Sequence, residues 1–160
     1  MPDEQEVKAA FCRNMARGWV AGAKEIRIQG FPGFKFIPIK DGDWYLLDGY
    51  CTPPGNRSSG ITSLTHRGVV VLTMEYGGWY EKGYTAFLKD VLREAYGRGE
   101  FHGGRGRFSR GLGGLLYSNR VGAVGLNFHG RERLYTESDR GGPPVTLHGE
   151  HNYSGMIFPS

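Results

Sequence analysis

The amino-acid sequence predicts an α+β domain in which a curved antiparallel sheet holds two helices on one face. Two segments repeat apolar residues at the helical period, and the other segments alternate apolar and polar residues as strands do. These segments follow one another as helix, strands, helix, strands, which favours the α+β class. Glycine accounts for 27 of 160 residues, which indicates tight turns between aromatic-rich strands, and the length suits a single domain over residues 1–160.

The first helix is predicted over residues 4–17. Asp3 can cap it, and Glu6 lies at the position that completes a capping box. Gly18 is expected to end it. The apolar residues that recur at helical spacing are Val7, Ala10, Phe11 and Met15.

The second helix is predicted over residues 85–96, with Thr85 as its N-cap and Gly97 as its stop. One face of this segment is apolar and the opposite face is charged, as in a helix that covers a core. The apolar stripe consists of Phe87, Leu88, Val91, Leu92 and Ala95.

Between the helices the sequence predicts a series of strands. Residues 24–29 alternate in polarity, and residues 31–40 contain two prolines, which places them at a sheet edge or in an irregular strand. After a turn at residues 41–43 a further strand is expected over residues 44–47. The composition of residues 51–60 is that of a loop.

A β-hairpin follows, formed by residues 61–66 and 69–76 around the turn Arg67-Gly68. The second of these strands is apolar on both faces from Val69 to Leu72, which indicates a central position in the sheet.

After the second helix the chain returns to strands. Residues 114–138 predict two or three of them, residues 141–144 a turn, and residues 145–158 the last strand. Residues 128–155 loosely repeat the pattern of residues 61–78, which suggests two similar hairpin units. The matching pairs are Gly68 with Gly142, Val71 with Val145, Glu75 with Glu150, Tyr76 with Tyr153 and Gly78 with Gly155.

The composition narrows the class of protein. A net charge of +4 is that of an ordinary surface and adds only a little weight to nucleic-acid binding. Cys12 and Cys51 form no metal or disulfide pattern, so we expect two reduced thiols. The first residues lack the apolar core of a signal peptide, and no segment has the apolar length of a membrane span. We therefore expect a cytoplasmic, bacterial-type protein that does not associate with membranes.

Several stretches of the chain carry a recognisable pattern: WYLLDGY at 44–50, VLTMEYGG at 71–78, FLKDVLR at 87–93, FHGRE at 128–132 and YSG at 153–155. Together they resemble a bacterial family of domains of unknown function, DUF5680. The resemblance covers nearly the whole chain, although the arginine-rich segment 105–110 and the long turn at 135–144 depart from the family pattern. It implies the same helix–strands–helix–strands fold. Members of such families sometimes accompany a helix-turn-helix domain, which implies a sensing or binding role and no known reaction.

The segment HGGRGRFSRGLGG, residues 102–114, is the most unusual stretch of the chain. It lacks the lysine and spacing of a phosphate-binding P-loop, and its glycines follow a helix instead of opening one, unlike a dinucleotide fingerprint. Arg105, Arg107 and Arg110 would bind an anionic ligand, nucleic acid included, through their guanidinium groups. The alternative is a mobile surface loop over the mouth of the sheet.

Two sets of titratable residues are candidates for chemistry. Late in the predicted central strand, Glu75 would act as a general acid or base if it is buried, together with His66 or His129; the alternative is that it faces water. On neighbouring strands, His129, His148 and Glu150 would form a metal site only if the strand register brings them together. We predict surface roles for these histidines, with no metal and no organic cofactor.

The aromatic residues near the strand ends are candidates to line a ligand cleft or simply to pack. The favoured hypothesis is thus a domain that binds a small anionic or aromatic molecule. A small cofactor-free enzyme is the first alternative and a nucleic-acid binder through the arginine-glycine segment the second. An exposed edge strand would also allow a homodimer. The aromatic ligand-binding candidates are Trp44, Tyr45, Tyr76, Trp79 and Phe128.

Overall fold

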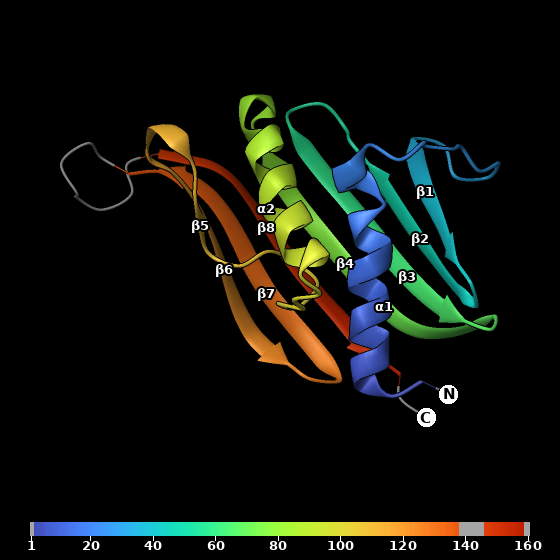
Figure 1. The fold of residues 1–160 in the computed structure, drawn as a ribbon. Helices are drawn as coiled ribbons and strands as arrows, with labels where there is room; N and C mark the ends of the chain where they lie inside the picture. Colours follow the sequence, from blue (N-terminus) through green and yellow to red (C-terminus); the bar gives the residue numbers. More distant parts are fainter. Residues whose placement is uncertain (1, 138–145, 159–160) are drawn as a thin grey trace.

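The computed structural model describes residues 2–137 and 146–158, in which one antiparallel sheet of eight strands curves around two α-helices (Figure 1). The strand order is β1-β2-β3-β4-β8-β7-β6-β5, so β4 and β8 form the middle of the sheet. The helices are α1 (Glu4–Ala16) and α2 (Thr85–Gly97), with the short 3-10 turns η1 (Trp19–Ala21), η2 (Lys82–Tyr84) and η3 (Leu112–Gly114). The strands are β1 (Phe34–Asp41), β2 (Trp44–Cys51), β3 (Arg57–His66), β4 (Val69–Tyr80), β5 (Ser109–Arg110), β6 (Leu115–Val124), β7 (Asn127–Thr136) and β8 (Thr146–Ile157).

The predicted fold class is confirmed, including the order of elements and the central position of β4. The two hairpin units are β3–β4 and β7–β8. Because β4 pairs with β8 in antiparallel register, Tyr76 lies directly opposite Tyr153, its counterpart in the sequence repeat. Two other residues of the repeat, Gly142 and Val145, lie outside the described residues.

The helix α1 begins as the sequence predicts. The Asp3 side chain accepts a hydrogen bond from the backbone N–H of Glu6, and the Glu6 side chain accepts one from the N–H of Asp3, which completes the capping box. The buried face of α1 packs against α2 and the sheet. Cys12 on this face and Cys51 at the end of β2 are both free thiols in the structure.

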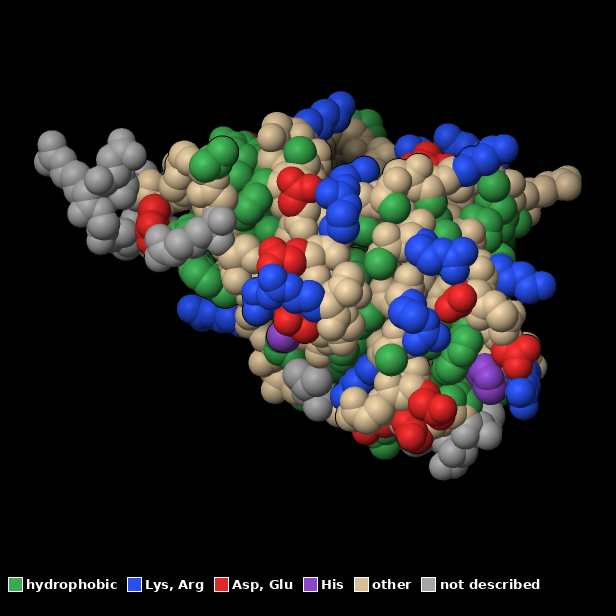
Figure 2. All heavy atoms as spheres, in the orientation of Figure 1, with side chains coloured by type: hydrophobic (Ala, Val, Ile, Leu, Met, Phe, Trp, Pro, Cys, Tyr) green, Lys and Arg blue, Asp and Glu red, His purple; other side chains and the backbone are tan. Residues whose placement is uncertain are grey.

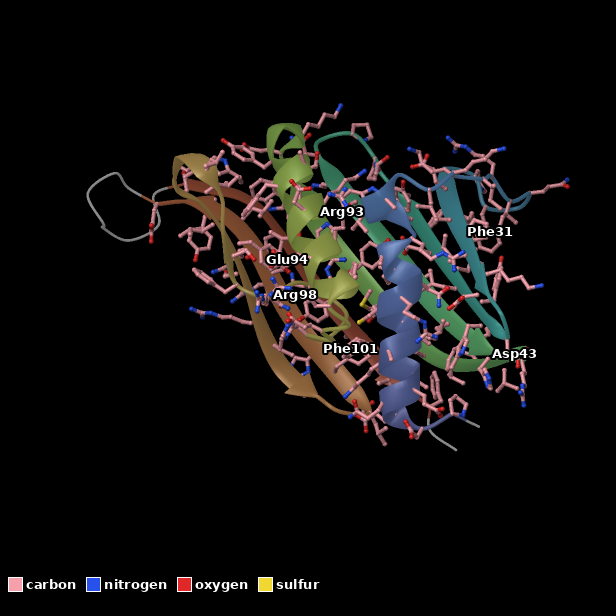
Figure 3. The ribbon with its side chains drawn as sticks, viewed as in Figure 1. Phe31, Asp43, Arg93, Glu94, Arg98 and Phe101 are labelled. Carbon is pink, nitrogen blue, oxygen red and sulfur yellow. The ribbon has the colours of Figure 1, made fainter. Side chains whose placement is uncertain are left out.

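The predicted caps of α2 were wrong. The chain already turns in η2 before α2 starts, so Thr85 is the first helical residue, and its hydroxyl donates to the carbonyl of Lys82. At the other end Gly97 is still helical, and Gly99 is the residue with a left-handed φ of 70°. Arg93 lies on the side of α2 that faces η1 (Figure 3) and donates to the carbonyl of Val20 at 2.6 Å.

Three strand boundaries also differ from prediction. Residues 24–29 form no strand and make a single bridge to the edge strand β1, between Ile26 and Phe36. The predicted loop at 51–60 is shorter, since β3 already begins at Arg57. The strand β4 continues through Gly77 and Gly78, because both glycines remain paired with β3 and β8.

Glycines on the concave face of the sheet make room for rings from neighbouring strands. A Cβ atom at Gly60 would lie 2.6 Å from Cζ of Tyr76. One at Gly78 would lie 2.6 Å from Cδ2 of His151 and would collide with the carbonyl oxygen of Glu150. The rings therefore lie flat across the glycines, which accounts for part of the high glycine content.

Replacing Gly78 by alanine is expected to lower the free energy of unfolding by about 2 kcal/mol, because the methyl group would displace both a backbone carbonyl and a buried ring. Gly83→Ala is the matched control, since a Cβ there has no neighbour within 4 Å. Urea unfolding followed by circular dichroism measures both variants. Equal stabilities for the two variants would contradict this account of the glycines.

The hydrophobic core lies between the helices and the concave face. Neither α1 nor α2, the long helices of the described chain, has the length and apolar character needed to cross a membrane. The core residues include Val7 and Phe11 from α1, Leu88 and Leu92 from α2, and Leu46, Leu64, Leu72 and Met74 from the sheet.

Candidate functional site

A cavity of about 480 Å³ lies between the helices and the concave face of the sheet. It is bounded on one side by α2 and on the other by the end of α1, by η1 and by the loop of residues 52–56. A recess is visible in Figure 2 near the top of the view, where Figure 1 places the start of α2 beside this loop. Its walls are mostly apolar and include Met15, Trp19, Val20, Tyr50, Leu88, Leu92 and Tyr96.

Polar side chains form the floor of the cavity, and they come from four strands and one loop. Strand alternation turns Asp48 of β2, Ser58 of β3 and His151 of β8 toward the helices, although these positions face an otherwise apolar interior. Tyr76 and Tyr80 of β4 lie between them. Arg105 reaches the same floor from the loop that follows α2.

Asp48 is a buried carboxylate whose hydrogen-bond partners, among the residues that the structure describes, are neutral hydroxyls. Its Oδ1 accepts hydrogen bonds from the hydroxyls of Thr62 (2.7 Å) and Tyr76 (2.9 Å). Burial raises the pKa of Asp48 above its ordinary value, and these two hydrogen bonds and the charge of Arg105 oppose the rise without cancelling it. The cavity therefore contains a carboxyl group that holds its proton more tightly than an exposed aspartate does.

Arg105 and Glu132 form a buried ion pair behind the floor. The Arg105 guanidinium donates to Oε1 of Glu132, and the hydroxyls of Tyr80 (2.6 Å) and Tyr117 (2.5 Å) donate to the same carboxylate. Burial by itself would raise the pKa of Glu132, but the charge and hydrogen bond of Arg105 outweigh it and hold this pKa below its ordinary value. Both groups are thus charged, and Nε of Arg105 has no hydrogen-bond partner among the described residues.

Ser58 and His151 form a second polar contact on the floor. Ser58 Oγ and His151 Nε2 lie 2.8 Å apart, and Gly78 between them in the sheet leaves room for the ring. Burial lowers the pKa of His151 to about 4, so the ring is neutral at pH 7. Its Nδ1 lies 3.9 Å from Oε1 of Glu132, which is too far for a hydrogen bond. Ser58, His151 and Glu132 thus follow one another like the nucleophile, base and carboxylate of a catalytic triad. The hydrogen bond between His151 and Glu132 that would orient the base is missing.

The first half of the segment at 102–114 is buried, so the expectation of a mobile surface loop was wrong for residues 103–106. The carbonyl of Gly104 accepts from the hydroxyl of Tyr96 at 2.9 Å, and the carbonyl of Gly106 accepts from Asn119 Nδ2 at 2.9 Å. These bonds hold the loop against α2 and β6 and thereby place Arg105 in the cavity floor.

The three arginines of this segment do not act together. Arg105 is 6% exposed and paired with Glu132. Arg107 is exposed and lies 3.5 Å from Glu94 and 3.7 Å from Glu100. The side chain of Arg110 lies outside the described part of the structure. Figure 3 shows Glu94 and Arg98 on the outward side of α2, in the same surface region.

Of the predicted aromatic ligand residues, Tyr76 lines the cavity and the other four do not. Trp44 lies against His66, with ring centres 4.5 Å apart and the ring planes tilted by 39°. Tyr45 and Trp79 alternate to the outer face of the sheet, opposite to the cavity. Phe128 is buried in the core against Phe101, and thus its role is packing.

The predicted catalytic residues are not gathered in a buried site. Glu75 is exposed on the outer face, where it accepts a hydrogen bond from Ser154 at 2.8 Å. Glu75 therefore faces water, which was the alternative to the buried acid or base, because the cavity is on the face of β4 that carries Tyr76. Glu75 and His129 both border a shallow depression on the outer face, and His66 lies away from it beside Trp44.

The residues considered for a metal site point in different directions. His129 faces outward, His148 Nδ1 lies 3.0 Å from Glu81, and Glu150 accepts from Arg133 at 2.5 Å. Within residues 2–137 and 146–158 no three His, Cys, Asp or Glu side chains are placed to hold a metal ion.

Four polar residues of the cavity region were missed by sequence reasoning: Asp48, Ser58, Glu132 and His151. A signal for Asp48 was present, since in WYLLDGY it shares a face with Leu46 and Tyr50, both buried. Burying a charged side chain at an inward position of a strand costs free energy unless the charge is paired and hydrogen-bonded, so an aspartate there indicates a polar site.

Comparisons of the chain with protein-family models, with curated proteins and with solved structures find no match.

Proposed function

We propose that this domain binds one small organic molecule in the cavity between α2 and the sheet. The volume of about 480 Å³ falls within the range of small-molecule sites, which combine apolar walls with a few polar groups. The observation that carries the proposal is the set of buried polar atoms on the cavity floor. Nε of Arg105 and Nδ1 of His151 lack hydrogen-bond partners within the described chain, whereas buried polar atoms are nearly always paired.

The ion pairs of Arg105 and Arg107 argue against nucleic-acid binding through the arginine-glycine segment. Arg105 is buried and neutralised by Glu132, and Arg107 lies near two carboxylates on the surface. A nucleic-acid interface needs unpaired cations that can reach phosphates. The resemblance to DUF5680, a bacterial origin, a cytoplasmic location and a homodimer all stay predictions.

A second candidate function is acid-base catalysis on the bound molecule, with Asp48 in the role predicted for Glu75. The observation that favours it is the raised pKa of this carboxyl group in a ligand-sized cavity. Chemical analysis of a ligand recovered after incubation separates the two functions. An unchanged molecule indicates a receptor, and a converted one indicates an enzyme.

Replacing Leu88 by phenylalanine is expected to abolish ligand binding, because this buried α2 side chain lines the cavity and would grow into it. In a thermal-shift screen of small organic molecules, ligands at a hundredfold excess over Kd should raise the Tm of the unaltered protein by about 5–10 °C. The Leu88→Phe variant should show no such rise.

Ala86→Phe is the matched control, because it adds an aromatic ring to the same helix at an exposed position. It should respond to ligands as the unaltered protein does. Ligands that stabilise Leu88→Phe as much as the unaltered protein would have to bind elsewhere. A screen in which no molecule raises the Tm of the unaltered protein would overturn the proposed function.

A further inference from the structure

The charges around the cavity do not cancel. Arg105 lies with Glu132 in a buried pair, and the groups bonded to Asp48 are the neutral hydroxyls of Thr62 and Tyr76. One guanidinium is thus shared by two buried carboxylates, which leaves an excess of one negative charge when Asp48 is ionised. A buried charge without a counterion is unfavourable, and a ligand of opposite charge would relieve it.

We propose that the cavity receives an organic cation, namely a protonated amine on a flat apolar body, with its ammonium group on the carboxylate of Asp48. This inference rests on the proposed function and specifies its ligand class. Both hydrogen bonds of Asp48 within the described chain end on Oδ1, so Oδ2 is the acceptor that remains for the ligand. Asp48 itself lines the cavity.

The tyrosines of the cavity are suited to contact a cation with their rings and not with their hydroxyls. The hydroxyl of Tyr50 donates to Glu25, that of Tyr80 to Glu132 and that of Tyr96 to the carbonyl of Gly104. What these side chains present to a ligand is therefore aromatic surface, and the faces of aromatic rings attract cations. Rings that line the cavity come from Trp19, Tyr50, Tyr76, Tyr80 and Tyr96.

An anion, which the sequence suggested, fits this site less well. It would place a third negative charge around a guanidinium that already serves Glu132. Arg57 and Lys82 border the cavity, but both are exposed, so water and salt screen their charges. Arg105 also lines the cavity, but Glu132 already neutralises it, so the carboxylate of Asp48 is the buried charge that a ligand would still have to neutralise.

The test compares three molecules of similar size and shape that differ in charge: 2-phenylethylamine, 2-phenylethanol and 3-phenylpropanoate. Isothermal titration calorimetry at pH 7 measures their affinities for the unaltered protein. The amine should bind about tenfold or more tightly than the alcohol, as expected for a hydrogen bond between charged groups, and the carboxylate should bind most weakly.

Asp48→Asn should remove this preference by weakening the amine about tenfold while leaving the alcohol nearly unchanged. Glu75→Gln, which removes an exposed carboxylate on the outer face, is the matched control and should alter neither affinity. The comparison of the three molecules on the unaltered protein requires no variant, so it holds even if Asp48→Asn does not fold.

The outcomes separate the ligand class from the proposed function. Equal affinities for amine and alcohol, or tightest binding of the carboxylate, would overturn the cationic ligand and leave the cavity as a binding site. The absence of binding by all three molecules would also overturn it, and the function itself would stand if the thermal-shift screen finds ligands that Leu88→Phe rejects. Failure of both experiments would overturn both proposals.

Discussion

The variant Glu132→Gln is expected to lose about 3–5 kcal/mol of its free energy of unfolding, the largest effect of any change considered for this protein. Glu132 is fully buried and is the counterion of Arg105, which is 6% exposed. An amide in its place leaves the guanidinium in the interior without a negative partner, and it weakens the acceptor of the Tyr80 and Tyr117 hydroxyls. Urea unfolding at pH 7, followed by circular dichroism, measures the loss.

Glu75→Gln is the control for this variant, because the same chemical change on the outer face should cost no more than about 0.5 kcal/mol. The double variant Arg105→Met, Glu132→Leu removes both charges and should recover part of the loss, since a buried pair is frequently no more stabilising than apolar residues of similar volume. The recovery is partial because the Tyr80 and Tyr117 hydroxyls lose the acceptor that Glu132 provides. If Glu132→Gln were as stable as Glu75→Gln, the buried ion pair would not hold the loop to the sheet as the structure indicates.

The second large effect is a loss of stability in mild acid that depends on His151. Its pKa is lowered from 6.5 to about 4 by burial, so the unfolded chain binds a proton there more readily than the folded protein. The stability from this residue is therefore complete above pH 6.5 and declines as the pH falls toward 4. Over this window the expected loss is about 3 kcal/mol, measured as the free energy of unfolding against pH.

His151→Gln should flatten this pH dependence, because glutamine keeps a polar side chain near Ser58 and does not titrate. His129→Gln, at an exposed histidine on the outer face, should leave the dependence as it is. Glu132 contributes little to the slope in this window, since its pKa is held below the ordinary value. The raised pKa of Asp48 acts in the opposite direction, but it is common to all three proteins. Identical curves for His151→Gln and the unaltered protein would exclude His151 as the cause.

Much of the fold follows from short-range patterns. The capping box at Asp3 and Glu6 depends on residues three positions apart, and the turn at Arg67-Gly68 depends on two adjacent residues that adopt positive φ angles. Local spacing of this kind predicted both helices, the central hairpin and the α+β class. It predicted element ends less well, because the end of α2 and the length of β4 depend on neighbouring segments.

The candidate site was predicted only in part. Tyr76 and Arg105 were expected to contact a ligand and do line the cavity, whereas Glu75 lies on the opposite face of the same strand. The alternation of side chains along β4 correctly assigned Glu75 and Tyr76 to opposite faces of the strand. Which of the two faces is turned toward the helices depends on how β4 pairs with β3 and β8. The sequence of β4 alone does not determine this pairing.

The sequence by itself determined the helices, the turns and the alternating faces of the strands, because these depend on neighbouring residues and on the conformations that glycine permits. Only the tertiary structure decided that Asp48, Arg105, Glu132 and His151 meet around one cavity. These residues are distant along the chain, and they come together because strand register places three of them on the concave face and a buried loop adds the fourth. Long-range pairing of this kind sets the charge of the cavity, which is the basis of the ligand class that we propose.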